Sequence, residues 1–154
     1  MKRALVVYDT TFGNTKLLAE EIAAGIEEAG DILCTLTKHS ELSEQDIASY
    51  EGVLFGCPVH ATTATRGIKG AIKKATKAGL DGKLGAVFDT YMGTQRARAV
   101  RKMESEIKRR APGMRLVTPG FTALVDGFRG PLNPAELPRA RDFGKAFGAE
   151  LLSS

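Results

Sequence analysis

The stretch Ala4-Leu5-Val6-Val7-Tyr8-Asp9-Thr10-Thr11-Phe12-Gly13-Asn14-Thr15 decides how the chain begins to fold. Its first half is a short apolar run, which is typical of a buried strand. Its second half holds hydroxyl, glycine and amide residues, and a run of good helix formers follows directly. A strand that turns at once into a helix points backbone N–H groups and the positive end of the helix at one place. The stretch therefore predicts a binding site for a phosphate group.

The composition is that of an ordinary water-soluble domain. The chain has 154 residues, of which 43% are hydrophobic and 26% charged, and we expect residues 1–154 to form a single domain. No stretch approaches the roughly 18 apolar residues of a membrane span. The apolar run behind Met1 is also too short for a secretory signal and soon reaches Asp9. These features predict a cytoplasmic protein without a membrane span.

Cysteine and histidine, the usual ligands of structural zinc, are few in this chain. The chain has two cysteines, Cys34 and Cys57, and two histidines, His39 and His60. None of the spacings between them matches a structural zinc site. We therefore expect no metal site.

Strand-like and helical patterns alternate along the whole chain. Helical stripes are separated by short apolar runs, and glycine or proline stands at most of the boundaries. The fifth strand is expected in two pieces, because Pro119 and Gly120 interrupt it. The expected strands are 3–8, 31–37, 52–57, 83–88 and 115–125, and the expected helices are 14–29, 43–50, 65–78, 94–110 and 133–151.

This alternation predicts an α/β fold, a doubly wound five-stranded parallel sheet with helices on both faces. Right-handed crossovers leave few strand orders, and 2-1-3-4-5 is the natural one for five strands. Ligands of such folds bind outside the carboxyl ends of the strands, where strands 1 and 3 diverge. The loops expected to meet there are 9–14, 58–66 and 89–93.

These loops carry a family resemblance. The string Thr10-Thr11-Phe12-Gly13-Asn14-Thr15 resembles the phosphate-binding loop of flavodoxins, and with Tyr8 and Asp9 it is similar to the flavodoxin-like domains of flavodiiron proteins. The resemblance extends to Gly56-Cys57-Pro58, to the segment from Phe88 to Gly93, and to the spacing of all five strand–helix units. It covers essentially the whole chain and implies a flavodoxin-like fold.

The resemblance implies that the chain binds FMN. The first loop would hold the phosphate, and the other two would lie against the isoalloxazine ring. Tyr91 is placed to stack on one ring face, while His60 either contacts the ring or is simply exposed. The residues expected to bind FMN are Thr10, Thr11, Phe12, Gly13, Asn14, Thr15, Pro58, Val59, His60, Ala61, Asp89, Thr90, Tyr91, Met92 and Gly93.

Three features depart from the family pattern. Phe12 stands where the family usually has threonine, so one hydroxyl contact to the phosphate is lost. The second loop has no Trp or Tyr and no glycine before Gly67, which argues against strong stabilisation of a half-reduced flavin. Asp89 allows two interpretations, a carboxylate beside the ring that disfavours the anionic reduced flavin, or a structural role in the turn.

The charge of the chain also differs from the acidic flavodoxins. Its net charge is +4, and basic residues concentrate in the helices at 66–77 and 96–110, which would be neighbours on one face of the sheet. Such a face is either a solvated surface or a docking site for an acidic redox partner. Nucleic acid is not expected, because no aromatic residues are interleaved with the charges and no nucleic-acid-binding motif occurs.

The sequence thus favours an electron-transfer protein that shuttles electrons between redox partner proteins. Two alternatives remain open. The small residues Ala61, Thr62, Thr63 and Ala64 could leave one flavin face open to a substrate, as in a small NAD(P)H- or quinone-linked reductase. The chain could also be a non-redox module that binds a partner through its basic face.

Overall fold

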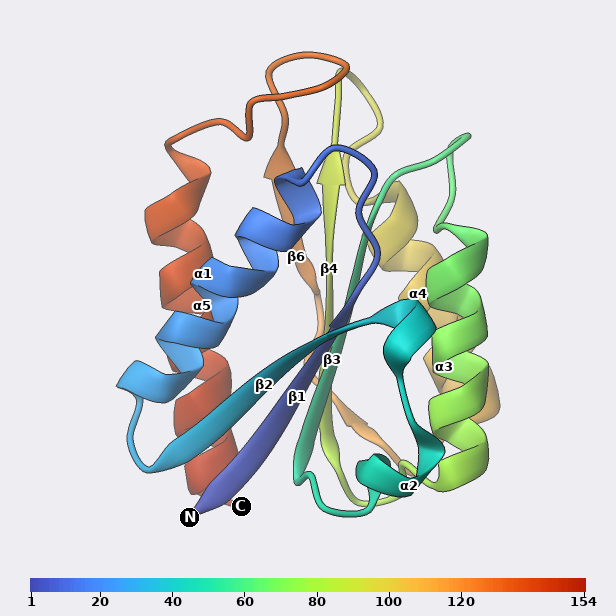
Figure 1. Cartoon of the computed structure of the whole chain (residues 1–154), viewed down its shortest axis with the longest axis vertical. Helices are drawn as coiled ribbons and strands as arrows, with labels where there is room; N and C mark the ends of the chain where they lie inside the picture. Colours follow the sequence, from blue (N-terminus) through green and yellow to red (C-terminus); the bar gives the residue numbers. More distant parts are fainter.

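A parallel sheet lies between two layers of helices in the computed structural model, which describes residues 1–154 (Figure 1). The strands follow the order β2-β1-β3-β4-β5, with β6 paired to β4 as well. The predicted doubly wound fold and its strand order are therefore confirmed. The strands are β1 (Lys2–Tyr8), β2 (Ile32–Lys38), β3 (Gly52–Pro58), β4 (Leu84–Tyr91), β5 (Arg115–Leu116) and β6 (Phe121–Leu124).

The last strand is divided, as the sequence predicts. Both of its pieces pair with β4 in parallel, Arg115 opposite Leu84 and Phe121 opposite Phe88. Pro119 lies between the pieces and cannot donate a hydrogen bond to the ladder. The division leaves β6 beside the carboxyl half of β4, so its own carboxyl end reaches the edge where the ligand-binding loops lie.

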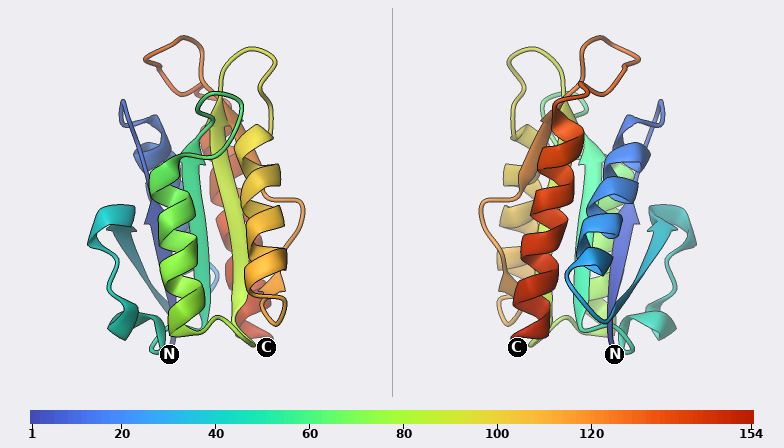
Figure 2. Two further views of the ribbon diagram at one scale, coloured as in Figure 1. Left: turned by 90° about the vertical axis from the view of Figure 1, so that its right-hand side faces the viewer. Right: turned by 90° about the vertical axis from the view of Figure 1, so that its left-hand side faces the viewer.

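The helices cover the two faces of the sheet. Figure 2 shows α3 and α4 on one face and α1 and α5 on the other. None of the helices combines the length and the apolar character that crossing a membrane requires. The helical segments are α1 (Asn14–Glu28), the 3-10 turn η1 (His39–Glu41), α2 (Glu44–Ile47), α3 (Arg66–Ala78), α4 (Arg98–Arg110) and α5 (Glu136–Leu152).

Each face of the sheet has its own apolar core. Phe55 and Ile72 belong to the core beneath α3 and α4, while Phe88, Ile22 and Phe147 belong to the core beneath α1 and α5. All five side chains are almost completely buried. The alternation of side chains along the strands places Phe55 of β3 and Phe88 of β4 on opposite faces of one sheet.

Glycine allows α1 and α5 to approach closely. A Cβ atom added at Gly25 would collide with the backbone carbonyl of Arg141, and one added at Gly144 would collide with that of Ile22. This close packing fixes the position of α1, whose amino end carries the predicted phosphate loop.

Two predicted helices are each four residues shorter than expected. Helix α2 has only four residues instead of 43–50, because Tyr50 is buried and the Glu51 carboxylate accepts the Arg3 N–H (2.6 Å), which draws the chain into β3. Helix α4 begins at Arg98 instead of residue 94, since Ala97 has a left-handed backbone (φ 61°) and donates its N–H to Thr122 Oγ1 (3.1 Å). Both corrections concern boundaries and leave the order of elements unchanged.

Candidate functional site

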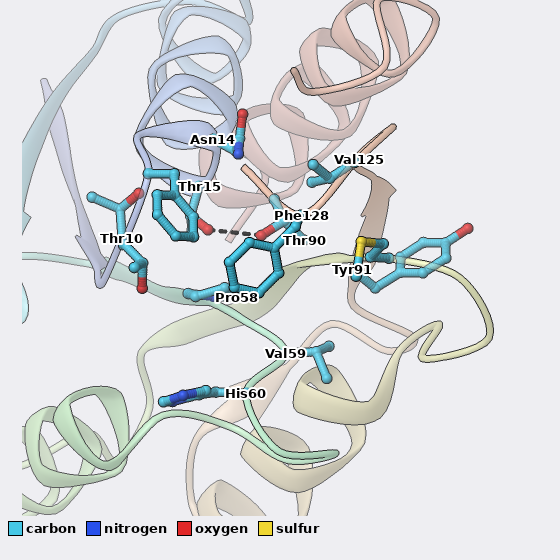
Figure 3. Close-up of a pocket in the computed structure, with 14 residues that line it drawn as sticks. Thr10, Asn14, Thr15, Pro58, Val59, His60, Thr90, Tyr91, Val125 and Phe128 are labelled. Carbon is cyan, nitrogen blue, oxygen red and sulfur yellow. Dashed lines mark hydrogen bonds between the residues drawn. The ribbon is translucent and has the colours of Figure 1, made fainter. Parts of the chain in front are cut away.

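A cavity of about 240 Å³ lies at the carboxyl edge of the sheet, where the loops after β1, β3, β4 and β6 meet (Figure 3). The loops after β1, β3 and β4 are the three that the predicted strand order places at the ligand-binding edge of the sheet. The cavity is lined by Thr10, Thr11, Phe12, Asn14, Thr15, Pro58, Val59, His60, Thr90, Tyr91, Met92, Val125, Gly127 and Phe128.

Four of the residues expected at the site do not line this cavity. Gly13 has a left-handed backbone (φ 91°) and forms the turn into α1. Ala61 and Gly93 lie in the second and third loops but outside the cavity wall, and Asp89 is completely buried beneath it. The remaining eleven residues of the prediction lie together around the cavity.

The backbone of residues 10–16 forms a cluster of unpaired donors. The N–H groups of Thr11, Phe12, Asn14, Thr15 and Lys16 donate to no acceptor within the chain. Only the Gly13 N–H in this segment is used, and it donates to Thr10 Oγ1 (3.0 Å). Free N–H groups at the start of a helix bind anions, because they also carry the positive end of the helix dipole. The loop can therefore take a phosphate group.

Two side chains of the same loop have hydrogen-bond partners within the chain. Thr15 is buried, and its hydroxyl is 2.8 Å from that of Thr90 at the end of β4. The Asn14 amide donates to the backbone carbonyl of Arg129 (3.2 Å). The Thr10 hydroxyl keeps its hydrogen free for a ligand, because its oxygen accepts from Gly13.

The second loop contains a tight turn in an unusual conformation. His60 and Thr63 exchange backbone hydrogen bonds of 2.8 and 3.1 Å, and between them Ala61 and Thr62 both have positive φ angles, 49° and 69°. Such a turn normally holds glycine or asparagine. The absence of glycine from this loop could be read from the sequence. That Ala61 and Thr62 nevertheless adopt the backbone conformation typical of glycine could not.

Tyr91 flanks the cavity at the end of β4. Its side chain is half-buried, and Figure 3 shows its hydroxyl directed away from Thr10 and Thr15. Val59 lies on the neighbouring loop, where its N–H donates to the Thr90 carbonyl (2.8 Å). The cavity thus has an apolar side, formed by Val59 and Tyr91, and a polar end at the phosphate loop.

The Asp89 carboxylate is buried and makes structural hydrogen bonds beneath the cavity. Its carboxylate accepts the N–H of Val100 in the first turn of α4 (2.9 Å) and the hydroxyl of Thr122 on β6. Burial raises the pKa of Asp89 to about 6, although these two hydrogen bonds act in the opposite direction. The carboxylate therefore joins β4, β6 and α4 below the cavity.

The fourth loop, between β6 and α5, is the part of the site that the sequence did not predict. It contributes Val125, Gly127 and Phe128 to the cavity wall, and Phe128 lies in Figure 3 between Thr10 and Tyr91. Its sequence held a usable signal, since an aromatic residue beside a glycine follows the last strand. The carboxyl ends of all parallel strands share one edge, so this loop also had to be considered.

Comparisons with known proteins agree with this geometry. The flavodoxin domain model matches residues 5–125. A flavodoxin from Clostridium saccharobutylicum is 27% identical over 85 residues, which are 55% of this chain and 53% of that protein. The matched part therefore spans about half the length of that curated relative.

Solved structures show the same fold at lower identity. An archaeal flavodoxin superposes with a TM-score of 0.85 at 20% identity, covering 97% of this chain and 99% of that one. The flavodiiron protein from Giardia intestinalis superposes with a TM-score of 0.80 at 19% identity, and the match covers 99% of this chain but 37% of that one.

The family match includes the strands and three of the four loops that build the cavity. Flavodoxins bind FMN and transfer electrons, as the sequence resemblance implies. FMN, the cofactor expected from the sequence, is the cofactor of the family whose model matches most of the chain. This chain belongs to the flavodoxin domain family.

Proposed function

We propose that this chain binds FMN in the cavity and shuttles electrons between redox partner proteins. The observation that carries the proposal is the cluster of free N–H groups at residues 11–16, which opens into a cavity with an apolar side. A phosphate at one end and a flat ring at the other match these two environments. The chain would act as one domain over residues 1–154, alone or as a module of a larger system.

Different residues would hold the phosphate and the ring of FMN. The backbone of residues 11–16 and the Thr10 hydroxyl would bind the phosphate. Val59 and His60 would face one side of the ring and Tyr91 the other. When bound, FMN supplies the redox chemistry, and the chain fixes its position and surroundings.

Helix α3 provides a basic surface next to the second loop. Arg66, Lys69, Lys73 and Lys77 recur along the helix, which contains no acidic residue. None of the four makes an ion pair. An acidic redox partner would be attracted to this surface by a field that salt screens.

Helix α4 contributes less charge than its sequence suggests. Glu106 makes ion pairs with Lys102 (3.3 Å), Arg109 (2.7 Å) and Arg110 (2.9 Å). Hydrogen bonds from Arg110 and Lys102 lower the pKa of Glu106 to about 2. The part of the basic region that stays free is therefore α3 together with Arg96, Arg98, Arg101 and Lys108, and we propose that the partner docks there.

A small flavin-dependent reductase is the second candidate. Ala61 and Thr62 are exposed, and the second loop places no Trp or Tyr over the cavity. One face of a bound ring would then be accessible to NAD(P)H or a quinone. Photoreduction of the FMN-loaded protein separates the candidates, because reduction in two one-electron steps supports a carrier and a single two-electron step supports a reductase.

The visible spectrum of the purified protein tests whether there is a flavin function at all. A flavin spectrum, or its appearance after FMN is added and excess is removed, supports both redox candidates. A folded protein that stays colourless after this treatment would contradict both and leave a partner-binding module.

A further inference from the structure

The loop between β6 and α5 lies directly against the phosphate loop. Its Arg129 carbonyl accepts the Asn14 amide (3.2 Å), and the rings of Phe128 and Phe12 lie 5.5 Å apart. The Arg129 guanidinium lies over the Phe12 ring, 5.7 Å from its centre, within the range of a cation–π contact. The contacts place a cation beside the predicted phosphate site.

The position of Arg129 is set by a closed turn. Gly130 donates its N–H to Gly127 (3.1 Å), which makes Phe128 and Arg129 the central residues of a β-turn. Asp126 donates to Pro131 (2.9 Å) and closes the base of the turn. Gly130 has a φ of +114°, and an added Cβ there would lie 2.7 Å from the Asn14 side chain. The turn is therefore seated on the first residue of α1.

The cations around this turn have no ion-pair partner. Arg129 is exposed and makes no ion pair, and the Asp126 carboxylate accepts from Asn133 (2.9 Å). The first turn of α1 contains no acidic residue but does contain Lys16, which is exposed. Two cations near the helix N-terminus are repelled by the positive end of the helix dipole. A phosphate dianion bound there would attract both the cations and the helix N-terminus.

We propose that Arg129 is a cationic ligand of the FMN phosphate. It compensates for the hydroxyl that Phe12 replaces, and the Phe12 ring holds the guanidinium beside the free N–H groups when no phosphate is bound. This inference rests on the proposed function and adds selectivity to it, because a ligand that carries a phosphate dianion should be favoured over the same ring without phosphate.

Titration of the protein with FMN and with riboflavin, followed by the quenching of their fluorescence, tests the proposal. We expect Arg129→Gln to weaken FMN binding about tenfold and to leave riboflavin binding within about twofold of the wild type. Arg129→Lys should lie in between, since it keeps the charge but loses the planar fork. The matched control is Arg115→Gln, because Arg115 lies at the opposite end of the sheet on β5 and should affect neither ligand.

Salt gives an independent measurement. The wild-type affinity for FMN should fall more steeply with added NaCl than that of Arg129→Gln. Unchanged FMN binding in Arg129→Gln would overturn the proposal, and so would an equal loss of FMN and riboflavin, which would indicate a general effect on the cavity. A wild type that binds neither ligand would instead overturn the proposed function. Circular dichroism confirms that each variant is folded before titration.

Discussion

The hydroxyl groups of Thr15 and Thr90 lie 2.8 Å apart under the cavity, and both side chains are buried. Thr15 is in the first turn of α1 and Thr90 near the end of β4, so this hydrogen bond ties the phosphate loop to the loop expected to flank the ring. It keeps the two halves of the proposed site in a fixed relation.

Removing one of these hydroxyl groups should destabilise the fold. Thr15→Val leaves the Thr90 hydroxyl buried without its partner, and we expect the free energy of unfolding to fall by about 1–3 kcal/mol. Thr90→Val should have a similar effect. Urea unfolding of both variants and of the double variant measures the coupling, and the double variant should lose less than the sum. Strictly additive losses would show that the two hydroxyl groups do not interact.

The buried Asp89 should make stability depend on pH. Burial raises the pKa of Asp89 to about 6, compared with about 3.9 for an unfolded chain. Because the folded state prefers the protonated form, the contribution of Asp89 to stability is complete below about pH 4 and is lost as the pH rises through 6. The difference corresponds to about 3 kcal/mol.

Asp89→Asn removes this titration while keeping the shape of the side chain. From pH 4 to pH 7 the wild type should therefore lose stability relative to the variant, as measured by urea unfolding at several pH values. Parallel stability curves for the two proteins would contradict the assignment of the raised pKa to Asp89.

The turn in the second loop should be strained by Thr62. A β-branched residue rarely adopts a φ of 69°, and the cost of left-handed backbone is about 1–2 kcal/mol per residue. Thr62→Gly should consequently raise the free energy of unfolding by up to about 1 kcal/mol, after the entropy cost of glycine is subtracted. Thr63→Gly is the matched control without positive φ and should be destabilising. Thermal unfolding of both variants measures the effect. A Thr62→Gly variant that is less stable than the wild type would contradict backbone strain at Thr62.

The basic surface on α3 should govern docking with an acidic partner. Lys73 is exposed, so Lys73→Glu should lower the rate of electron transfer to an acidic ferredoxin used as a probe by about tenfold at low salt. Glu106→Gln should raise the rate of electron transfer, because the variant releases Lys102, Arg109 and Arg110 from their ion pairs with Glu106. Arg115→Glu changes the charge equally on distant β5 and is the control. Stopped-flow rates that are the same for all variants and at all salt concentrations would exclude docking through α3.

Most of the fold could be predicted from the sequence, because strand and helix periods alternate clearly. The strand order, the division of the last strand at Pro119 and the pairing of α3 with α4 on one face follow from this alternation and from general rules of topology. The helix boundaries at 43–50 and 94–110 could not be predicted. They depend on long-range contacts, such as the one between Glu51 and Arg3, that have no local signature.

The site was predictable in outline and less so in detail. The phosphate loop is a local motif, whereas the hydrogen bonds of Asn14 and Thr15 join segments more than 70 residues apart in sequence. The roles of Asp89 and Phe128 likewise depend on which residues pack against β4 and the phosphate loop. Residue type alone cannot distinguish a buried helix cap from a carboxylate beside a ring.

Titration of FMN fluorescence with the flavin-free protein tests the central claim most directly. The account predicts that quenching saturates at one FMN per chain at micromolar concentrations, because a single cavity joins the free N–H groups of residues 11–16 to the side formed by Val59 and Tyr91. Unchanged fluorescence in the presence of the folded protein at these concentrations would contradict it.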